Sequence, residues 1–227
     1  MQQSDLKVHQ LLLGPMENYC YIIADQASKK CMLIDPAWDV KTITDTIEKN
    51  EYELTSIIIS HYHPDHCGGH LWGHDIEGVA ELLKKFDVPV LCHSDEKDGI
   101  LTITKIAPSG IRTIASGDDY QLGTQKLKFI HTPGHTPGSI CLLWNNCLFA
   151  GDTLFINGCG RVDLPGGNAE QLHDSLSNKL MKLDPKTVLY PGHAYAPQKS
   201  VTFQELLTLN PFIQNMTDKA NWIKKFG

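Results

Sequence analysis

A short run of the chain, SHYHPDHCGG at residues 60–69, is dense in side chains that bind transition metals. Its metal-binding side chains fall within six residues: His61, His63, Asp65 and His66. Imidazole and carboxylate groups are the usual ligands of Zn²⁺ and also suit iron and manganese. Buried together, they lose hydration and cost folding free energy unless a partner satisfies them. The run therefore predicts a metal site that takes further ligands from elsewhere in the chain.

Three more side chains of ligand type directly follow predicted strands. His135 lies in the loop HTPGHTPGS, Asp152 in FAGDTL and His193 in LYPGHAY. Side chains that extend from the ends of rigid strands towards one common point can form a preorganised metal site. With the first run, the chain offers five histidines and two aspartates in this arrangement. That set is large enough to bind two ions that share one carboxylate.

We therefore expect a site for two divalent metal ions, with zinc as the expected metal and iron or manganese as alternatives. Asp152 is expected to lie between two ligand groups: His61, His63 and His135 on one ion, and Asp65, His66 and His193 on the other. A water bridging two such ions is acidified to hydroxide near neutral pH, and the ions polarise a carbonyl under attack. Asp65 is also a candidate catalytic residue, because its carboxylate can orient that hydroxide.

The other histidines are not assigned to this site. His70 and His74 are four residues apart and could share a helix face, but we expect them to flank the site or to face solvent. His131 is expected at a strand end with a hydrogen-bond partner. Isolated histidines in loops are usually surface residues, so we expect no metal role for His9, His93 and His173.

The composition is that of an ordinary globular chain and excludes some classes of partner. With 41% hydrophobic and 20% charged residues, the chain suits one domain over residues 1–227. The net charge of -6, without any basic cluster, argues against nucleic acid as a partner. No run reaches the ~20 apolar residues of a membrane span, and the N-terminus lacks a signal-peptide pattern. Seven cysteines without a CxxC pair favour a reducing compartment, so a cytoplasmic location is expected.

Strand and helix patterns alternate along the chain, with no repeat and no linker. Short apolar runs predict strands at Val8–Leu13, Cys20–Ala24, Cys31–Ile34, Ser56–Ile59, Pro89–Cys92, Tyr120–Leu122, Lys126–His131, Ile140–Trp144, Cys147–Ala150 and Thr187–Tyr190. Apolar residues at helical spacing predict helices at Asp39–Lys49, Ile76–Phe86 and Leu172–Leu183, and in the tail from Ser200 with a break at Asn210-Pro211. Residues 94–110 are expected to form a loop with one short element.

The motifs SHYHPDH, TPGHTPGS, AGDTLF and YPGHAY, in this order, resemble those of the metallo-β-lactamase-fold hydrolases. The resemblance covers most of the chain, from GPMENYCYII to NPF at residues 210–212. It implies an α/β fold of the αβ/βα sandwich type, in which two mixed sheets pack face to face with helices on the outer faces. It also implies that the metal site lies along one edge of the sandwich.

Within this superfamily, GDTLFINGCGR resembles the corresponding segment of glyoxalase II. The resemblance implies a thioester hydrolase in which a metal-bridging hydroxide attacks a small, hydroxyacyl-glutathione-like thioester. It also implies that Arg161 and Tyr195 contact the substrate, with Arg161 making a two-pronged hydrogen bond to a carboxylate. The alternatives are a structural salt bridge from Arg161 to Asp163 and packing of Tyr195 under its loop.

The chain departs from the long eukaryotic glyoxalase II in two respects. Only about 34 of the 227 residues follow His193, so the helical domain with further glutathione contacts is not expected, and Asp163 replaces an aromatic residue. The segment GCGRVDLPGGN is closer to short bacterial glyoxalase-II-like proteins and to persulfide dioxygenases. A dioxygenase of that kind would hold one iron on His61, His135 and Asp152, and a lactonase is a further alternative. Metal content distinguishes them, because two ions favour hydrolysis and one iron favours oxidation.

Overall fold

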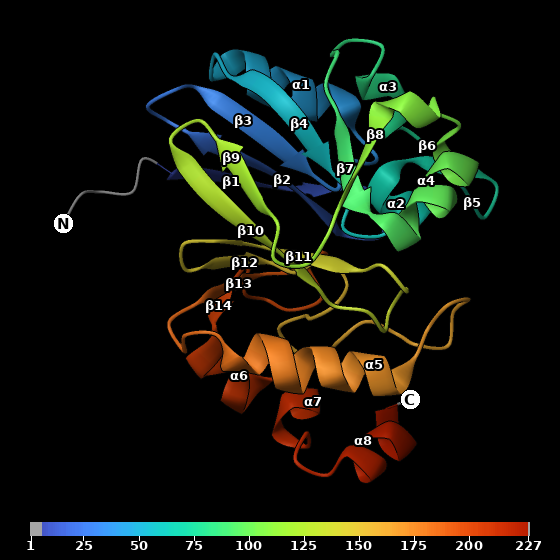
Figure 1. The fold of residues 1–227 in the computed structure, drawn as a ribbon, viewed down its shortest axis with the longest axis vertical. Coiled ribbons are helices and arrows are strands. Elements are labelled where there is room, and N and C mark those ends of the chain that lie inside the picture. Colours follow the sequence, from blue (N-terminus) through green and yellow to red (C-terminus); the bar gives the residue numbers. More distant parts are fainter. Residues whose placement is uncertain (1–5, 227) are drawn as a thin grey trace.

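The computed structural model describes residues 6–226, and its centre is a sandwich of two mixed sheets (Figure 1). The first six-stranded sheet has the order β1-β2-β3-β4-β7-β8, and the second has the order β14-β13-β12-β11-β10-β9. Helices lie on the outer side of each sheet, with α1 beyond the first and α5 and α6 beyond the second (Figure 1). This is the αβ/βα architecture that the sequence motifs implied.

The strands are mostly short. The first sheet contains β1 (Leu6–Leu13), β2 (Asn18–Asp25), β3 (Lys30–Ile34), β4 (Glu53–Ile58), β7 (Val90–His93) and β8 (Ile111–Ile114). The second contains β9 (Asp119–Leu122), β10 (Gln125–His131), β11 (Ile140–Trp144), β12 (Cys147–Phe149), β13 (Val188–Tyr190) and β14 (Val201–Thr202). A separate two-stranded hairpin is formed by β5 (Gly69–Leu71) and β6 (His74–Ile76).

The helices divide between the two halves of the sandwich. Those in the first half are α1 (Val40–Lys49), α2 (Pro64–Cys67), α3 (Val79–Leu82) and α4 (Lys97–Thr104). Those in the second half are α5 (Ala169–Asp174), α6 (Phe203–Leu209), α7 (Pro211–Gln214) and α8 (Lys219–Phe226). Within residues 6–226, none of the helices has the length and apolar character required to cross a membrane.

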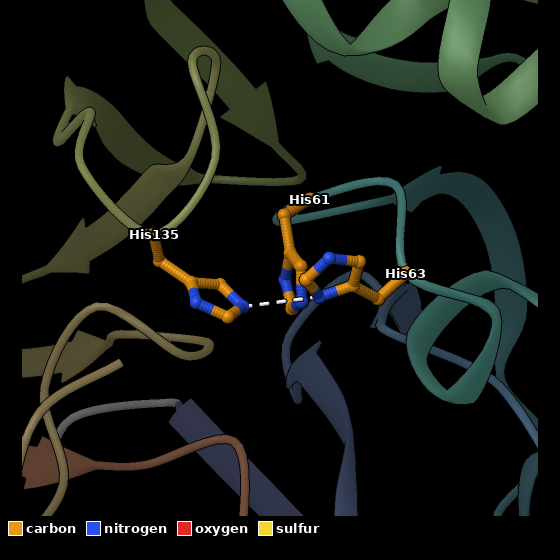
Figure 2. Close-up of side chains that lie close together, drawn as sticks. All are labelled: His61, His63 and His135. Carbon is orange, nitrogen blue, oxygen red and sulfur yellow. Dashed lines mark hydrogen bonds between the residues drawn. The ribbon is translucent and has the colours of Figure 1, made fainter. Parts of the chain in front are cut away.

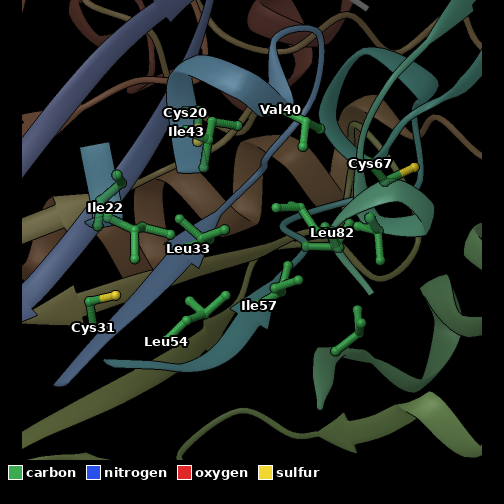
Figure 3. Packing of buried hydrophobic residues seen from close by; sticks show 14 of the residues in the cluster. Cys20, Ile22, Cys31, Leu33, Val40, Ile43, Leu54, Ile57, Cys67 and Leu82 are labelled. Carbon is green, nitrogen blue, oxygen red and sulfur yellow. The ribbon is translucent and has the colours of Figure 1, made fainter. Parts of the chain in front are cut away.

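Buried side chains form three layers that join the sheets to each other and to the helices. Side chains of a strand alternate between its two faces, so Ile22 and Ile23 of β2 enter different layers. Ile22 packs with Ile43 of α1 on the outer side of the first sheet (Figure 3), whereas Ile23 packs between the two sheets. The third layer lies between the second sheet and the C-terminal helices and includes Leu148 and Leu176. Both faces of each sheet are thus covered, which explains why the strands read as nearly continuous apolar runs.

The predicted elements are largely present, and the clearest example is α1. It begins directly after Asp39, whose carboxylate accepts a hydrogen bond from the backbone N–H of Thr42 and so caps the helix. The predicted helix 172–183 is also helical, from Ala169 to Lys182, with a π-helical turn at Ser175–Lys179. The second predicted tail helix follows the break at Asn210, as expected.

Two regions differ from the prediction. The predicted helix 76–86 is shorter, because Ile76 pairs with Gly69 in the β5–β6 hairpin and α3 begins only at Val79. Gly78 is the N-cap of α3, and its extended backbone packs so closely that a Cβ there would lie 2.4 Å from the backbone oxygen of Cys67. The idea that His70 and His74 share a helix face is therefore wrong. Residues 94–110, predicted as a loop with one short element, contain the short helix α4, whereas strand β8 directly after them was not predicted.

Candidate metal centre

The structure brings six of the seven predicted ligand side chains together in two adjoining groups, and the seventh, Asp152, lies against both. In each group the candidate ligand atoms lie within 4.8 Å of one another: His61, His63 and His135 in the first group, and Asp65, His66 and His193 in the second. In the first group, Nδ1 of His63 and Nε2 of His135 are 3.0 Å apart (Figure 2). In the second, Nε2 of His66 and Nε2 of His193 are 3.2 Å apart.

Asp152 touches both groups. Its Oδ1 lies 3.3 Å from Nε2 of His66, and its Oδ2 lies 3.3 Å from Nε2 of His193 and 3.8 Å from Nε2 of His135. Two glycines make room for this carboxylate. A Cβ on Gly192 would lie 2.3 Å from its Oδ1, and a Cβ on Gly160 would lie 2.1 Å from its backbone oxygen. Gly192 of YPGH and Gly160 of GCGR are therefore glycines because any larger residue would collide with Asp152.

The strand topology explains why these residues meet. Asp152 and His193 follow β12 and β13, which are neighbouring parallel strands, so both emerge at the same edge of the second sheet. The run that contains His61 follows β4 of the first sheet. Pro64 occupies the first turn of α2, where its fixed φ favours helix formation, and Asp65 and His66 follow in that turn.

The hydrogen bonds of four histidines fix which ring nitrogen faces the cluster. Each Nδ1 has a partner on the side away from the cluster: Ser60 Oγ for His61 (3.0 Å), Asp35 Oδ2 for His66 (3.1 Å), the Arg161 carbonyl for His135 (2.7 Å) and the Met16 carbonyl for His193 (2.8 Å). Carbonyl and carboxylate oxygens only accept, so these Nδ1 atoms carry the proton. Ser60 Oγ donates to Asp35 (2.6 Å) and therefore also accepts from His61. The four Nε2 lone pairs are then available to an ion.

Asp35 is a site residue that the sequence analysis missed. It is buried, its Oδ1 accepts from the Ser60 N–H (2.7 Å), and its Oδ2 accepts from Ser60 Oγ and His66. One carboxylate thus orients a candidate ligand in each group. A signal was present in the sequence, because Asp35 directly follows β3, the parallel neighbour of β4, and so lies at the same sheet edge as His61.

Glu96, also missed, joins the two ligand-bearing loops. Its side chain is fully buried and accepts hydrogen bonds from the backbone N–H of Tyr62 (2.6 Å), between His61 and His63. It also accepts from the backbone N–H of Gly138 (2.6 Å) and the Thr136 hydroxyl (2.8 Å), next to His135. A carboxylate with several such donors is held firmly in place, since each bond is charge-assisted.

Asn18, at the start of β2, completes the surroundings of Asp65. The indole N–H of Trp38 donates to its Oδ1 (2.9 Å), which directs its Nδ2 towards Asp65 Oδ2 at 2.9 Å. Asn18 is buried, and its backbone forms an isolated bridge with His193. This contact links β2 to a candidate ligand on the second sheet.

The electrostatics differ between the two groups. Burial lowers the pKa of His61 well below its usual range and that of His63 to about 4, so both imidazoles are neutral. In the second group burial is outweighed by carboxylates: Asp152 and Asp65 raise the pKa of His66 well above its usual range, and Asp152 raises that of His193 to about 9. Burial alone would raise the pKa values of Asp65 and Asp152. The charge of His66 outweighs this effect and holds both pKa values well below the usual range. An ion in the second group would replace protons.

The donor set fits a pair of divalent ions. Among the residues that the structure describes, His61 Nε2 is buried without a hydrogen-bond partner. Nδ1 of His63 and Nε2 of His135 face one another at hydrogen-bond distance. An ion bound by both rings would use the lone pairs of both nitrogen atoms. Histidine and carboxylate ligands in two sets, with one carboxylate reaching both, match the preferences of zinc, iron and manganese.

A pocket of about 620 Å³ gives access to this centre, and His63, Asp65, His135, Asp152 and His193 are among its lining residues. The two predicted substrate contacts, Arg161 and Tyr195, line it as well. The Tyr195 ring stacks on His193 at 4.6 Å between centroids, and burial raises its pKa to about 12, so the phenol remains a hydrogen-bond donor. The Arg161 guanidinium, however, forms a two-pronged ion pair with Asp163 at 2.7 and 2.6 Å. Both proposed roles of Arg161 thus have geometric support.

The histidines left out of the metal site lie elsewhere. His131 ends β10, and its Nε2 donates to the Pro137 carbonyl (2.9 Å), as expected for a strand-end histidine. Its ring stacks on His93 with 8° between the planes. Asp95 lies close to both rings, but imidazole lone pairs point within their ring planes, and parallel planes do not converge on one ion. His70 is exposed in the hairpin and pairs with Asp75.

Comparison with known proteins identifies the family. The model of the metallo-beta-lactamase superfamily matches residues 13–193. The "Probable polyketide biosynthesis zinc-dependent hydrolase PksB" of Bacillus subtilis is 32% identical over 212 residues, covering 92% of this chain and 86% of that protein. A hydroxyacylglutathione hydrolase of Bdellovibrio bacteriovorus is 33% identical over 195 residues, covering 85% and 69%.

A similar architecture is found in a solved structure, ETHE1 from Myxococcus xanthus. Its TM-score is 0.82 at 27% identity, and the match covers 97% of this chain and 89% of that one. The relatives carry different names, so the match establishes the family and the metal-dependent hydrolase class rather than one substrate. The chain belongs to the metallo-β-lactamase superfamily and is a metal-dependent hydrolase of that fold.

Proposed function

We propose that the protein is a thioester hydrolase of glyoxalase II type that binds two divalent ions. The observation that carries this proposal is the pair of ligand groups, each with three side chains, that Asp152 touches and that contribute to the lining of the pocket. His61, His63 and His135 would hold one ion, Asp65, His66 and His193 would hold the other, and Asp152 would contact both. Zinc is the proposed metal, since the name of PksB includes zinc dependence.

Two ions held by these residues would supply an acidified water and polarise the substrate carbonyl. The reaction converts a thioester and a hydroxide ion into a carboxylate and a thiol. A bond forms between the hydroxide oxygen and the carbonyl carbon, the carbon–sulfur bond breaks, and the hydroxide proton ends on the departing sulfur. A thiolate is a good leaving group, so the site needs no strong general acid.

The side chains at the pocket have distinct proposed roles. Asp65 lines the pocket, and its carboxylate can accept a hydrogen bond from the attacking water while its Oδ2 is held by Asn18. Tyr195 can donate a hydrogen bond to the substrate from a phenol that stays protonated. Arg161 can bind a carboxylate of a glutathione-like carrier when it exchanges Asp163 for the substrate.

One group of relatives supports a thioester substrate, and the relatives together do not decide its carrier. One curated relative is named hydroxyacylglutathione hydrolase, and another is named for polyketide biosynthesis. The glyoxalase II reaction is the better starting point, because GDTLF and GCGR, with Arg161, are present in this chain. We therefore propose a small-molecule thioester, with a glutathione or similar thiol as its carrier, as the substrate.

Hydrolysis of S-D-lactoylglutathione by the purified protein, loaded with zinc and measured with and without a chelator, tests the proposal. We expect turnover that the chelator abolishes and two ions per chain by elemental analysis. A protein that binds two zinc ions but hydrolyses no thioester would exclude the activity. One iron per chain, together with oxygen uptake on glutathione persulfide, would instead support the dioxygenase alternative.

A further inference from the structure

The β5–β6 hairpin places an exposed tryptophan at the pocket. Trp72 is 79% exposed, more than any other large hydrophobic residue in the described part of the chain, residues 6–226. It nevertheless lines the pocket, together with Leu71 of the same hairpin and Met16 from the loop before β2. Exposed tryptophan loses the free energy that burial of its large apolar surface would provide. Because Trp72 lines the same pocket as the candidate metal-binding side chains, we expect a bound small molecule to cover it.

The backbone of this turn is also unusual. Trp72 has φ of +50° and Gly73 has φ of +85°, and turns with two such residues are normally formed by Asn-Gly or Asp-Gly. A bulky residue in the left-handed region is strained, and such strain persists mainly at ligand-contact and catalytic sites. Residue 72 could have been polar and less strained, so the tryptophan side chain itself is the feature to explain.

The base of the hairpin is held in place. Gly69 packs so closely on α4 that a Cβ there would lie 2.4 Å from a methyl group of Ile103. On the second strand, at the same base, Ile76 is buried and pairs with Gly69. The tip with Trp72 therefore extends from an anchored base, which allows it to keep a defined position at the pocket.

The remaining pocket wall is neutral and largely apolar. Apart from the candidate metal ligands, the charged lining residue is Arg161, and its charge is already paired with Asp163. Apolar lining comes from Met16, Leu71, Trp72, Phe155, Leu164 and Pro165. The volume of about 620 Å³ falls within the range of pockets that enclose drug-sized ligands. A short hydroxyacyl group would leave much of this apolar wall uncovered.

We infer that Leu71, Trp72 and Met16 form an acyl-binding wall, and that the preferred substrates are thioesters with an extended apolar acyl group. This inference rests on the proposed thioesterase activity and concerns the acyl group rather than the thiol carrier. The wall would lower the free energy of the bound acyl chain by removing apolar surface from water, with the gain increasing for each added methylene.

A series of neutral thioesters of N-acetylcysteamine with acetyl, butyryl, hexanoyl and octanoyl groups tests the inference on the zinc-loaded protein. We expect kcat/KM to rise with chain length, by up to about fourfold per methylene group. In Trp72→Ala the ratio of kcat/KM for hexanoyl to that for acetyl should fall about tenfold. Leu207→Ala is the matched control, since Leu207 is also exposed but lies outside the pocket, and it should leave that ratio unchanged.

Binding of analogues in which CH₂ replaces the thioester sulfur, measured by calorimetry, tests the wall independently of hydrolysis. Affinity should increase with chain length in the wild-type protein and increase less in Trp72→Ala. Affinity and kcat/KM that do not depend on chain length, or that fall equally for all lengths in Trp72→Ala, would overturn the inference. Length-dependent binding without hydrolysis of any thioester would support the wall but refute the proposed reaction, so the two failures are distinguishable.

Discussion

The metal centre and the pocket wall are built in opposite ways. His61, His66, His135 and His193 are each at most 2% exposed, and each has a hydrogen-bond partner on the nitrogen facing away from the cluster. Trp72 and Tyr195 are 79% and 46% exposed, and the Arg161 side chain is 61% exposed. The centre is thus fixed by many mutual contacts, whereas the wall can change by single substitutions. We therefore expect substitutions in the candidate centre to impair metal binding and substitutions in the wall to change substrate preference, and the variants below test both expectations.

Asp152→Ala should have the largest effect, because it removes the side chain that touches both groups. We expect loss of both ions. We also expect kcat/KM to fall by more than the ~10–100-fold that is typical when a residue hydrogen-bonded to a metal ligand is removed. Elemental analysis and thioester turnover measure the two effects. Two ions retained in the variant would show that Asp152 does not join the groups.

Acidification should weaken the two ion sites unequally. His193, with its pKa raised to about 9, and His66, with its pKa also raised, must lose protons before an ion binds the second group. Below the pKa of His193, affinity there should fall about tenfold per pH unit for each proton displaced. His63, with a pKa lowered to about 4, and His61 are already neutral between pH 6 and about 8, so they add no such dependence. Zinc titrations at several pH values should show one steep and one shallower dependence, and equal slopes would contradict this difference.

Glu96→Gln should have an intermediate effect that reports on the rigidity of the centre. The amide can accept through one oxygen only, and its NH₂ group would face a backbone N–H of Tyr62 or Gly138. We expect zinc affinity to fall about tenfold, at the lower end of the range for outer partners. Glu53→Gln on the exposed surface of β4 is the matched control. Unchanged zinc affinity in Glu96→Gln would show that the two loops hold their positions without this carboxylate.

The sequence predicted the centre far better than its surroundings, for a physical reason. A metal site requires particular types of side chain, so the candidate ligands His135, Asp152 and His193 were recognisable from local patterns, and the structure brings them close to one another. Glu96 and Asn18 act through contacts with residues far away in the chain, at Gly138 and Asp65, and no local pattern reveals such pairs. The β5–β6 hairpin was not predicted, because strands of three residues are too short to show an alternating apolar pattern, and its last residue, Ile76, was assigned to the helix 76–86. Asp35 could have been found, since parallel strands β3 and β4 end at one edge.

Arg161→Ala should have the smallest effect, and it separates the two roles of that side chain. Because the guanidinium is exposed and already paired, removing it should raise KM for a glutathione thioester severalfold with little change in kcat. Asp163→Asn should have the opposite effect, since it frees Arg161 to bind a substrate carboxylate and so lowers that KM. Neither variant should alter KM for a neutral N-acetylcysteamine thioester, which has no carboxylate to bind. If both variants change KM for charged and neutral substrates alike, the ion pair has a structural role. It would then stabilise the loop in which the Arg161 carbonyl accepts a hydrogen bond from His135, and other residues would recognise the carrier.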